Sequence, residues 1–196
     1  MAAVHRTAPL LALALLLAAA GASAADAPDE IKTWTEPETS GAPTYIAEGI
    51  VAATPAQVWS LVSKCADYTK NMPSISASQE LSRSGDESSQ WSAVCEVTAD
   101  APFPFSDLTS VSRATMTVDA KSGGYTRTWT LLRGDYEVND GSWSLVPVDG
   151  GAKTRVTYRI HVKPKLPLPD SLIQSAQGTR LPQVIQLLRD RTAQRR

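Results

Sequence analysis

The chain has 196 residues, 42% of them hydrophobic, and its 19 basic and 20 acidic side chains give a net charge of −1. A balance so close to neutral offers no basic surface, so we expect no nucleic-acid partner. The length fits a short leader followed by one domain large enough to bury a hydrophobic core.

The first 24 residues have the organisation of a secretory signal peptide. Arg6 precedes the apolar run Ala8–Ala20, which has 13 residues, and the small residues Ala22–Ala24 follow. The run is too short to cross a bilayer, which takes about 20 apolar residues. We therefore expect cleavage after Ala24 and export to the bacterial periplasm. The alternative is an uncleaved anchor.

Residues 25–43 are polar and rich in Pro, Thr and Glu. Such a stretch has few side chains to anchor it, so a flexible N-terminal arm is predicted. Trp34 stands out, and it either packs back onto the domain or stays exposed. The folded domain is expected over residues 44–196.

The domain opens with a predicted strand over residues 44–53, where apolar and polar residues alternate. A helix is predicted over residues 54–70, because Thr54 is a good N-cap and Pro55 is tolerated in a first turn. Pro73 excludes further helix. One helical face collects the apolar side chains Val58, Leu61, Val62 and Cys65.

Six further strands are predicted, separated by turn sequences rich in Gly, Ser, Asn and Asp. In the last of them, Val156, Tyr158 and Ile160 share one face while polar residues share the other. This alternation is typical of an antiparallel sheet with one solvated side. The predicted ranges are Ile75–Leu81, Gln90–Thr98, Ser110–Ala120, Tyr125–Arg133, Gly141–Val148 and Thr154–Val162.

Residues 169–196 are predicted to form a long helix, with Asp170 or Ser171 as its cap and a bend at Pro182. The order is strand, helix, six strands, long helix. Because most connections are hairpins, this order predicts an α+β fold in which a curved antiparallel sheet wraps around the C-terminal helix.

The chain has two cysteines, Cys65 and Cys95. In an oxidising compartment an even number favours a disulfide, and the alternative is two buried thiols. A metal site is not expected, since His161 is the one histidine after the leader and the cysteines lie far apart.

Three stretches carry a resemblance to a known superfamily. "TPAQVWSLVSKCADYTKNMPSI", the loop "APFPFSDL" (residues 101–108) and "NDGSWSLVPVDGGAKTRVTYRIHVKP", which resembles the last two strands, occur in the order found in the START-like, or polyketide cyclase and coenzyme Q-binding (SRPBCC), superfamily. The sequence departs from many relatives at Leu108, where they carry Arg, and at Thr69, where they carry Pro. The matching positions are Thr54, Pro55, Val58, Trp59, Tyr68, Met72 and Pro73.

The resemblance implies a helix-grip (START/Bet v 1-like) fold, with a hydrophobic tunnel between the sheet and the long C-terminal helix. Members bind lipids, sterols, quinones or polyketides there, and a few cyclise or dehydrate their ligand. No role is carried over for the arginine that Leu108 replaces.

Candidate cavity residues are those on the inward face of each predicted strand, where alternate side chains share a face, and those on the apolar face of the C-terminal helix. The alternative for each of them is an ordinary place in a filled core. The candidates are Trp91, Ala93, Val97, Trp129, Leu131, Trp143, Leu145, Val156, Tyr158 and Ile160 from the strands, and Ile173, Ala176, Gln177 and Val184 from the helix.

Charged residues supply few candidates for chemistry. Arg113 and Arg127 lie within strands, where an inward side chain could hold a carboxylate or phosphate and an outward one would be solvated. Asp107 beside Ser106 could move protons or stabilise a turn. His161 falls on the predicted solvated face, which argues against a catalytic histidine.

These features predict an exported protein that binds or transfers a hydrophobic small molecule (a lipid, quinone, sterol or polyketide-like compound), without a cofactor and with transient membrane contact. One alternative is a cyclase or dehydratase that uses Asp107 and Tyr158. The other is a partner-binding domain with a filled core. No nucleophile motif or phosphate loop is present, and the oligomeric state is not predicted.

Overall fold

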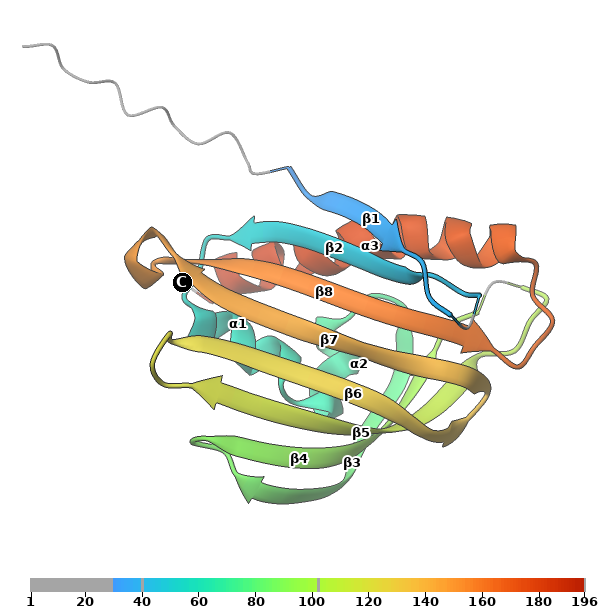
Figure 1. The fold of residues 1–196 in the computed structure, drawn as a ribbon, viewed down its shortest axis with the longest axis horizontal. Coiled ribbons are helices and arrows are strands. Elements are labelled where there is room, and N and C mark those ends of the chain that lie inside the picture. Colours follow the sequence, from blue (N-terminus) through green and yellow to red (C-terminus); the bar gives the residue numbers. More distant parts are fainter. Residues whose placement is uncertain (1–29, 40, 102, 196) are drawn as a thin grey trace, which may run out of the picture.

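The computed structural model describes residues 30–39, 41–101 and 103–195, so the expected signal peptide lies outside the described residues. Within these ranges, eight antiparallel strands form one curved sheet in the order β1-β2-β8-β7-β6-β5-β4-β3 (Figure 1). The strands are β1 Lys32–Glu36, β2 Thr44–Val51, β3 Ile75–Asp86, β4 Gln90–Ala99, β5 Leu108–Asp119, β6 Gly124–Gly134, β7 Tyr136–Val148 and β8 Lys153–Pro164. The helices are α1 Pro55–Val62, η1 Cys65–Asp67, α2 Tyr68–Asn71, η2 Asp149–Gly151 and α3 Asp170–Ala193.

β1 lies within the stretch for which the sequence predicted an arm without regular structure. It pairs with β2, placing Trp34 opposite Ile46. Arg159 of β8 donates two hydrogen bonds to the Glu36 carboxylate, at 3.2 Å and 2.5 Å. Backbone hydrogen bonds to β2 and this ion pair hold in place a segment that has little apolar area of its own. Trp34 remains 39% exposed.

The helix predicted over residues 54–70 is divided into α1, η1 and α2. Its start is confirmed: Thr54 and Gln57 form a reciprocal capping box before Pro55. The break follows Val62, where Lys64 has extended backbone angles. Tyr68 Oη donates to the carbonyl of Val62 at 2.7 Å, which satisfies an acceptor freed at the end of α1.

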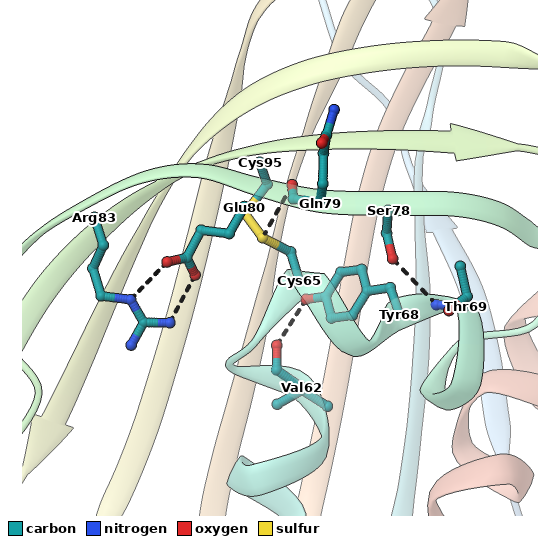
Figure 2. The surroundings of a disulfide bond; sticks show 9 residues. All are labelled: Val62, Cys65, Tyr68, Thr69, Ser78, Gln79, Glu80, Arg83 and Cys95. Atoms are coloured by element: carbon teal, nitrogen blue, oxygen red, sulfur yellow. Dashed lines mark hydrogen bonds and ion pairs between the residues drawn. A yellow bond between two sulfur atoms is a disulfide. The ribbon is translucent and has the colours of Figure 1, made fainter.

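Cys65 and Cys95 form a disulfide, which confirms one of the two alternatives drawn from the sequence (Figure 2). The bond joins η1 to β4 and closes a separation of 30 residues. The turn from α1 to α2 is thereby held against the sheet.

Strands β3 to β8 form the meander that the turn signals predicted, and one turn assignment is wrong. The residues "VNDG" lie inside β7, and β6 and β7 pair only from Tyr125↔Leu145 to Trp129↔Gly141. Beyond that point, hydrogen bonds to side chains of β7 take the place of backbone hydrogen bonds between the two strands. Trp129 Nε1 donates to Asn139 Oδ1 at 3.2 Å, and Leu131 N donates to Asp140 Oδ1 at 2.9 Å. The sequence shows that Asn and Asp favour turns. It does not show that their side chains can instead accept hydrogen bonds from a neighbouring strand where backbone pairing ends.

α3 runs along β2 (Figure 1). From its midpoint onward it buries Leu181, Val184, Ile185 and Leu188, and a Cβ on Gly49 of β2 would approach Ile185 Cγ2 within 2.9 Å. Glycine thus permits close contact between the helix and the strand. Pro169 takes the N-cap position without a side-chain bond, so neither Asp170 nor Ser171 caps α3 as predicted. Among the described residues no helix is long and apolar enough to cross a membrane.

Candidate ligand-binding cavity

A cavity of about 200 Å³ lies between the concave face of the sheet and the N-terminal half of α3. We call this part of the interior the hollow half. Its walls come from α2 and the turn after it, from β4 to β8, and from α3. The residues proposed from the sequence that line it are Val97, Arg127, Trp129, Trp143, Tyr158, Ile160, Ile173, Ala176, Gln177 and Val184.

Four other candidates are buried but belong to a filled half of the same interior, beneath α1. They belong to the same buried cluster as Trp59, whose ring centroid lies 5.6 Å from that of Trp91 and 5.1 Å from that of Tyr125. Parity placed these side chains on the correct face, but α1 fills the space in front of them. The four are Trp91, Ala93, Leu145 and Val156.

Two candidates lie outside both halves. Arg113 is exposed on β5, where its inward-facing neighbours are Ser112 and Ala114. Leu131 has inward parity but follows Trp129, the last β6 residue paired with β7, and it is only half-buried. Because Arg113 is exposed, it takes the outward, solvated position that was one of its two alternatives.

The cavity also has lining residues to which sequence reasoning gave no role. Tyr68, Met72 and Pro73 belonged to the segment that carried the resemblance, so their motif was a usable signal. Tyr136 and Asn139 were missed because they lie in the stretch predicted as a turn. The other missed residues are Ser74, Ile75, Cys95, Ala99, Asp100, Ala101, Leu108, Ser110, Ser112, Val162, Pro164, Leu168, Leu172, Arg180 and Leu181.

Three aromatic rings form a connected wall of the cavity. The ring centroids of Trp143 and Tyr158 are 4.4 Å apart, and Trp129 stacks on Tyr158 at 6.0 Å. Neighbouring strands therefore place both tryptophans at the cavity, and Trp143 is only 1% exposed. The wall offers a flat apolar surface for a ligand.

Two phenols in the cavity keep their protons at neutral pH. Burial raises the pKa of Tyr158 far above its ordinary value, and it raises the pKa of Tyr136 to about 12. Each can therefore donate a hydrogen bond to a ligand but cannot act as a base.

Arg127 is the inward arginine of the two that the sequence proposed. It is 4% exposed and lines the cavity. Its guanidinium carbon lies 5.3 Å from the Tyr68 ring centroid and 5.1 Å from that of Trp129, within cation–π distance.

Asp107 does not line the cavity. Its carboxylate accepts hydrogen bonds from Ser76 Oγ and from Ala101 N, both at 3.2 Å. This is the turn-stabilising alternative considered for Asp107. His161 also lies away from the cavity lining.

The curved sheet, the long C-terminal helix and the cavity between them define a START-like helix-grip protein. Residues 51–189 match the family described as polyketide cyclase/dehydrase and lipid transport. The chain belongs to this family, as the resemblance in its sequence implied.

Solved structures share the fold at low sequence identity. The STAR-related lipid transfer protein from Xanthomonas axonopodis is 19% identical, with a TM-score of 0.67 over 85% of this chain and 99% of that one. Human StAR-related lipid transfer protein 5 is 15% identical, with a TM-score of 0.68 over 86% and 88%. The Zhui aromatase/cyclase from Streptomyces is 13% identical, with a TM-score of 0.60 over 78% and 94%. A search of curated proteins found no significant match.

Proposed function

We propose that this protein is exported and binds or carries a hydrophobic small molecule in the cavity between the sheet and α3. The observation that carries the proposal is the cavity itself, walled by Trp129, Trp143, Tyr158 and the apolar side chains of α3. The lipid transfer names of two structural neighbours agree with this use. A partner-binding domain with a filled core is not favoured, because a cavity of about 200 Å³ lies between the sheet and α3.

The size of the cavity restricts the ligand. About 200 Å³ is less than the roughly 300–1,000 Å³ typical of sites that enclose a drug-sized molecule. We therefore expect a compact ligand, or one chain of a larger lipid, rather than an entire enclosed phospholipid.

Organic extraction of the purified protein followed by mass spectrometry tests ligand binding directly. We expect a hydrophobic molecule in the extract, and we expect the emptied protein to take up a fluorescent fatty-acid or quinone analogue. Recovery of no such molecule, together with no uptake of either analogue, would contradict the proposal.

Export has a separate test. When the complete chain is expressed in a bacterium, we expect the periplasmic fraction to contain a protein whose first residue is Ala25. Retention of the leader on a membrane-bound protein would instead support the uncleaved anchor.

Transient membrane contact is part of the proposed transfer. Phe103 is 96% exposed in the loop that follows Ala101, a cavity-lining residue. An apolar side chain in this position can enter a bilayer surface beside the cavity. We expect Phe103→Ser to slow ligand transfer between vesicles without changing affinity for the ligand in solution. Unchanged transfer would remove Phe103 from the proposal.

A cyclase or dehydratase is the second candidate, favoured by the family and by the two protonated phenols. In that case Tyr136 or Tyr158 would donate a hydrogen bond to a carbonyl oxygen of the substrate and stabilise the negative charge that develops there. If Tyr136→Phe and Tyr158→Phe both leave turnover of polyketide-like substrates unchanged, this role for the phenols is excluded.

A further inference from the structure

Arg127 is a buried cation for which no described residue supplies a counter-ion. No described residue accepts a hydrogen bond from its guanidinium, no described carboxylate pairs with it, and its Nε is buried without a partner. Its strand neighbours are Met116 of β5 and Trp143 of β7, neither of which carries an opposite charge. Tyr68, which lies against it, directs its hydroxyl to the Val62 carbonyl.

An arrangement of this kind costs free energy. Burying a charge is costly unless it is paired and hydrogen-bonded. The rings of Tyr68 and Trp129 compensate part of the cost, since both lie within cation–π distance of the guanidinium carbon. A ring contact does not replace a hydrogen-bond acceptor, so the guanidinium still needs one, and a ligand in the cavity can supply it.

The described part of the cavity lining has a second cation and a single acid. Arg180 of α3 also lines the cavity, and it donates to the backbone carbonyl of Asp100 at the end of β4. Among the described residues of the lining, Asp100 is the only acid, and it is exposed at the rim. The cavity is thus cationic in a chain whose net charge is −1. A positive interior in a slightly negative protein favours entry of an anion.

We propose that the ligand is a compact hydrophobic carboxylic acid whose carboxylate pairs with Arg127 while its apolar part contacts Trp129, Trp143 and α3. This inference rests on the proposed ligand-binding function and specifies its ligand class. A carboxylate fits because its two oxygens match the planar fork of a single guanidinium. A fatty acid and an aromatic acid share this chemistry.

The experiment compares acids with alcohols of matched size. Tryptophan fluorescence, with Trp129 and Trp143 as reporters, is used to titrate the purified protein with decanoate against decanol and with 2-naphthoate against 2-naphthol. We expect at least one acid to bind about tenfold or more tightly than its alcohol, as a charge-assisted hydrogen bond would give. The better of the two acids distinguishes a fatty acid from an aromatic acid.

Substitutions then locate the effect. Arg127→Met keeps an unbranched side chain and removes the charge, so it should weaken binding of the preferred acid about tenfold or more and weaken binding of the alcohol much less. Arg127→Lys should retain part of the preference. Arg113→Met is the matched control, because it removes an exposed arginine from the neighbouring strand and should change neither affinity.

The outcomes separate this inference from the function on which it rests. Equal binding of acid and alcohol by the native protein would contradict the carboxylate site and leave ligand binding intact. Equal weakening of both ligands by Arg127→Met would also overturn it. Binding of neither class would contradict both proposals. The native comparison holds even if a variant folds poorly, and circular dichroism of each variant checks its fold.

Discussion

The filled and hollow halves of the interior share the same strands but differ in the helix that covers them. Beneath α1, Trp59 packs against Trp91 and Tyr125, and no residue of α1 lines the cavity. Beneath the N-terminal half of α3, Ala176 and Gln177 face the aromatic wall, and a cavity remains. The difference shows that the covering helix, rather than the sheet, determines where a ligand could bind.

α3 contains the same contrast within one helix. Its C-terminal half uses large apolar side chains such as Ile185 and Leu188, both fully buried. Its N-terminal half has small or polar residues around Gly178 and is only partly buried. One end of the helix therefore stabilises the fold, and the other covers the cavity.

The largest expected effect comes from two matched leucine substitutions in α3. Leu188→Ala should lower the free energy of unfolding by about 2–5 kcal/mol, because Leu188 is fully buried. Leu172→Ala, at a half-buried position on the cavity, should lower it by less than about 1 kcal/mol. Urea denaturation measures both values. Equal losses would show that the two ends of α3 pack alike.

The disulfide lies at the boundary between the two halves, and its removal should have the next largest effect. Replacing Cys65 and Cys95 together by serine should cost about 3 kcal/mol, because a closed loop of 30 residues is released in the unfolded chain. Ligand binding should weaken as well, since α2 carries Tyr68 and Met72 into the cavity wall. If affinity is unchanged while stability falls, other contacts position α2.

Filling the hollow half should have the smallest effect on stability and a large effect on binding. Ala176→Leu places extra carbon in the empty cavity, so the free energy of unfolding should change by no more than about 1 kcal/mol. Affinity for the ligand should fall at least about tenfold. Ala193→Leu, at the exposed end of the same helix, is the control and should leave affinity unchanged. A ligand that binds both variants equally does not occupy this cavity.

Local patterns predicted most of the architecture. Alternation predicted the strands, and the Thr54 cap predicted the start of α1. The order of elements predicted a curved antiparallel sheet around the C-terminal helix, and the superfamily resemblance implied the helix-grip fold. The length of α1 and the strand β1 were not predictable in this way, because a disulfide and an ion pair with distant residues determine them. Periodicity describes neighbours in the chain and contains nothing about such partners.

The cavity residues were predictable only in part. The alternation of side chains along the strand places Arg127 on the same face as Trp129, so the sequence did indicate an inward orientation. An unpaired buried arginine is rare, and for that reason a solvated position was the natural alternative. Parity could not separate Trp91 from Val97, which share a face of β4. Which of them meets a cavity depends on the helix above, and α1 covers only one end of the strand.

The outer strand β3 has a consequence for the behaviour of the protein at high concentration. It is long and lies at the margin of the sheet, where unpaired backbone groups could recruit another molecule. Two irregularities interrupt its register with β4, and Arg83 links Glu80 and Glu87 along it. Register irregularities and charges of this kind hinder the pairing of another molecule's strand with β3, so this edge of the sheet is a poor template for fibres.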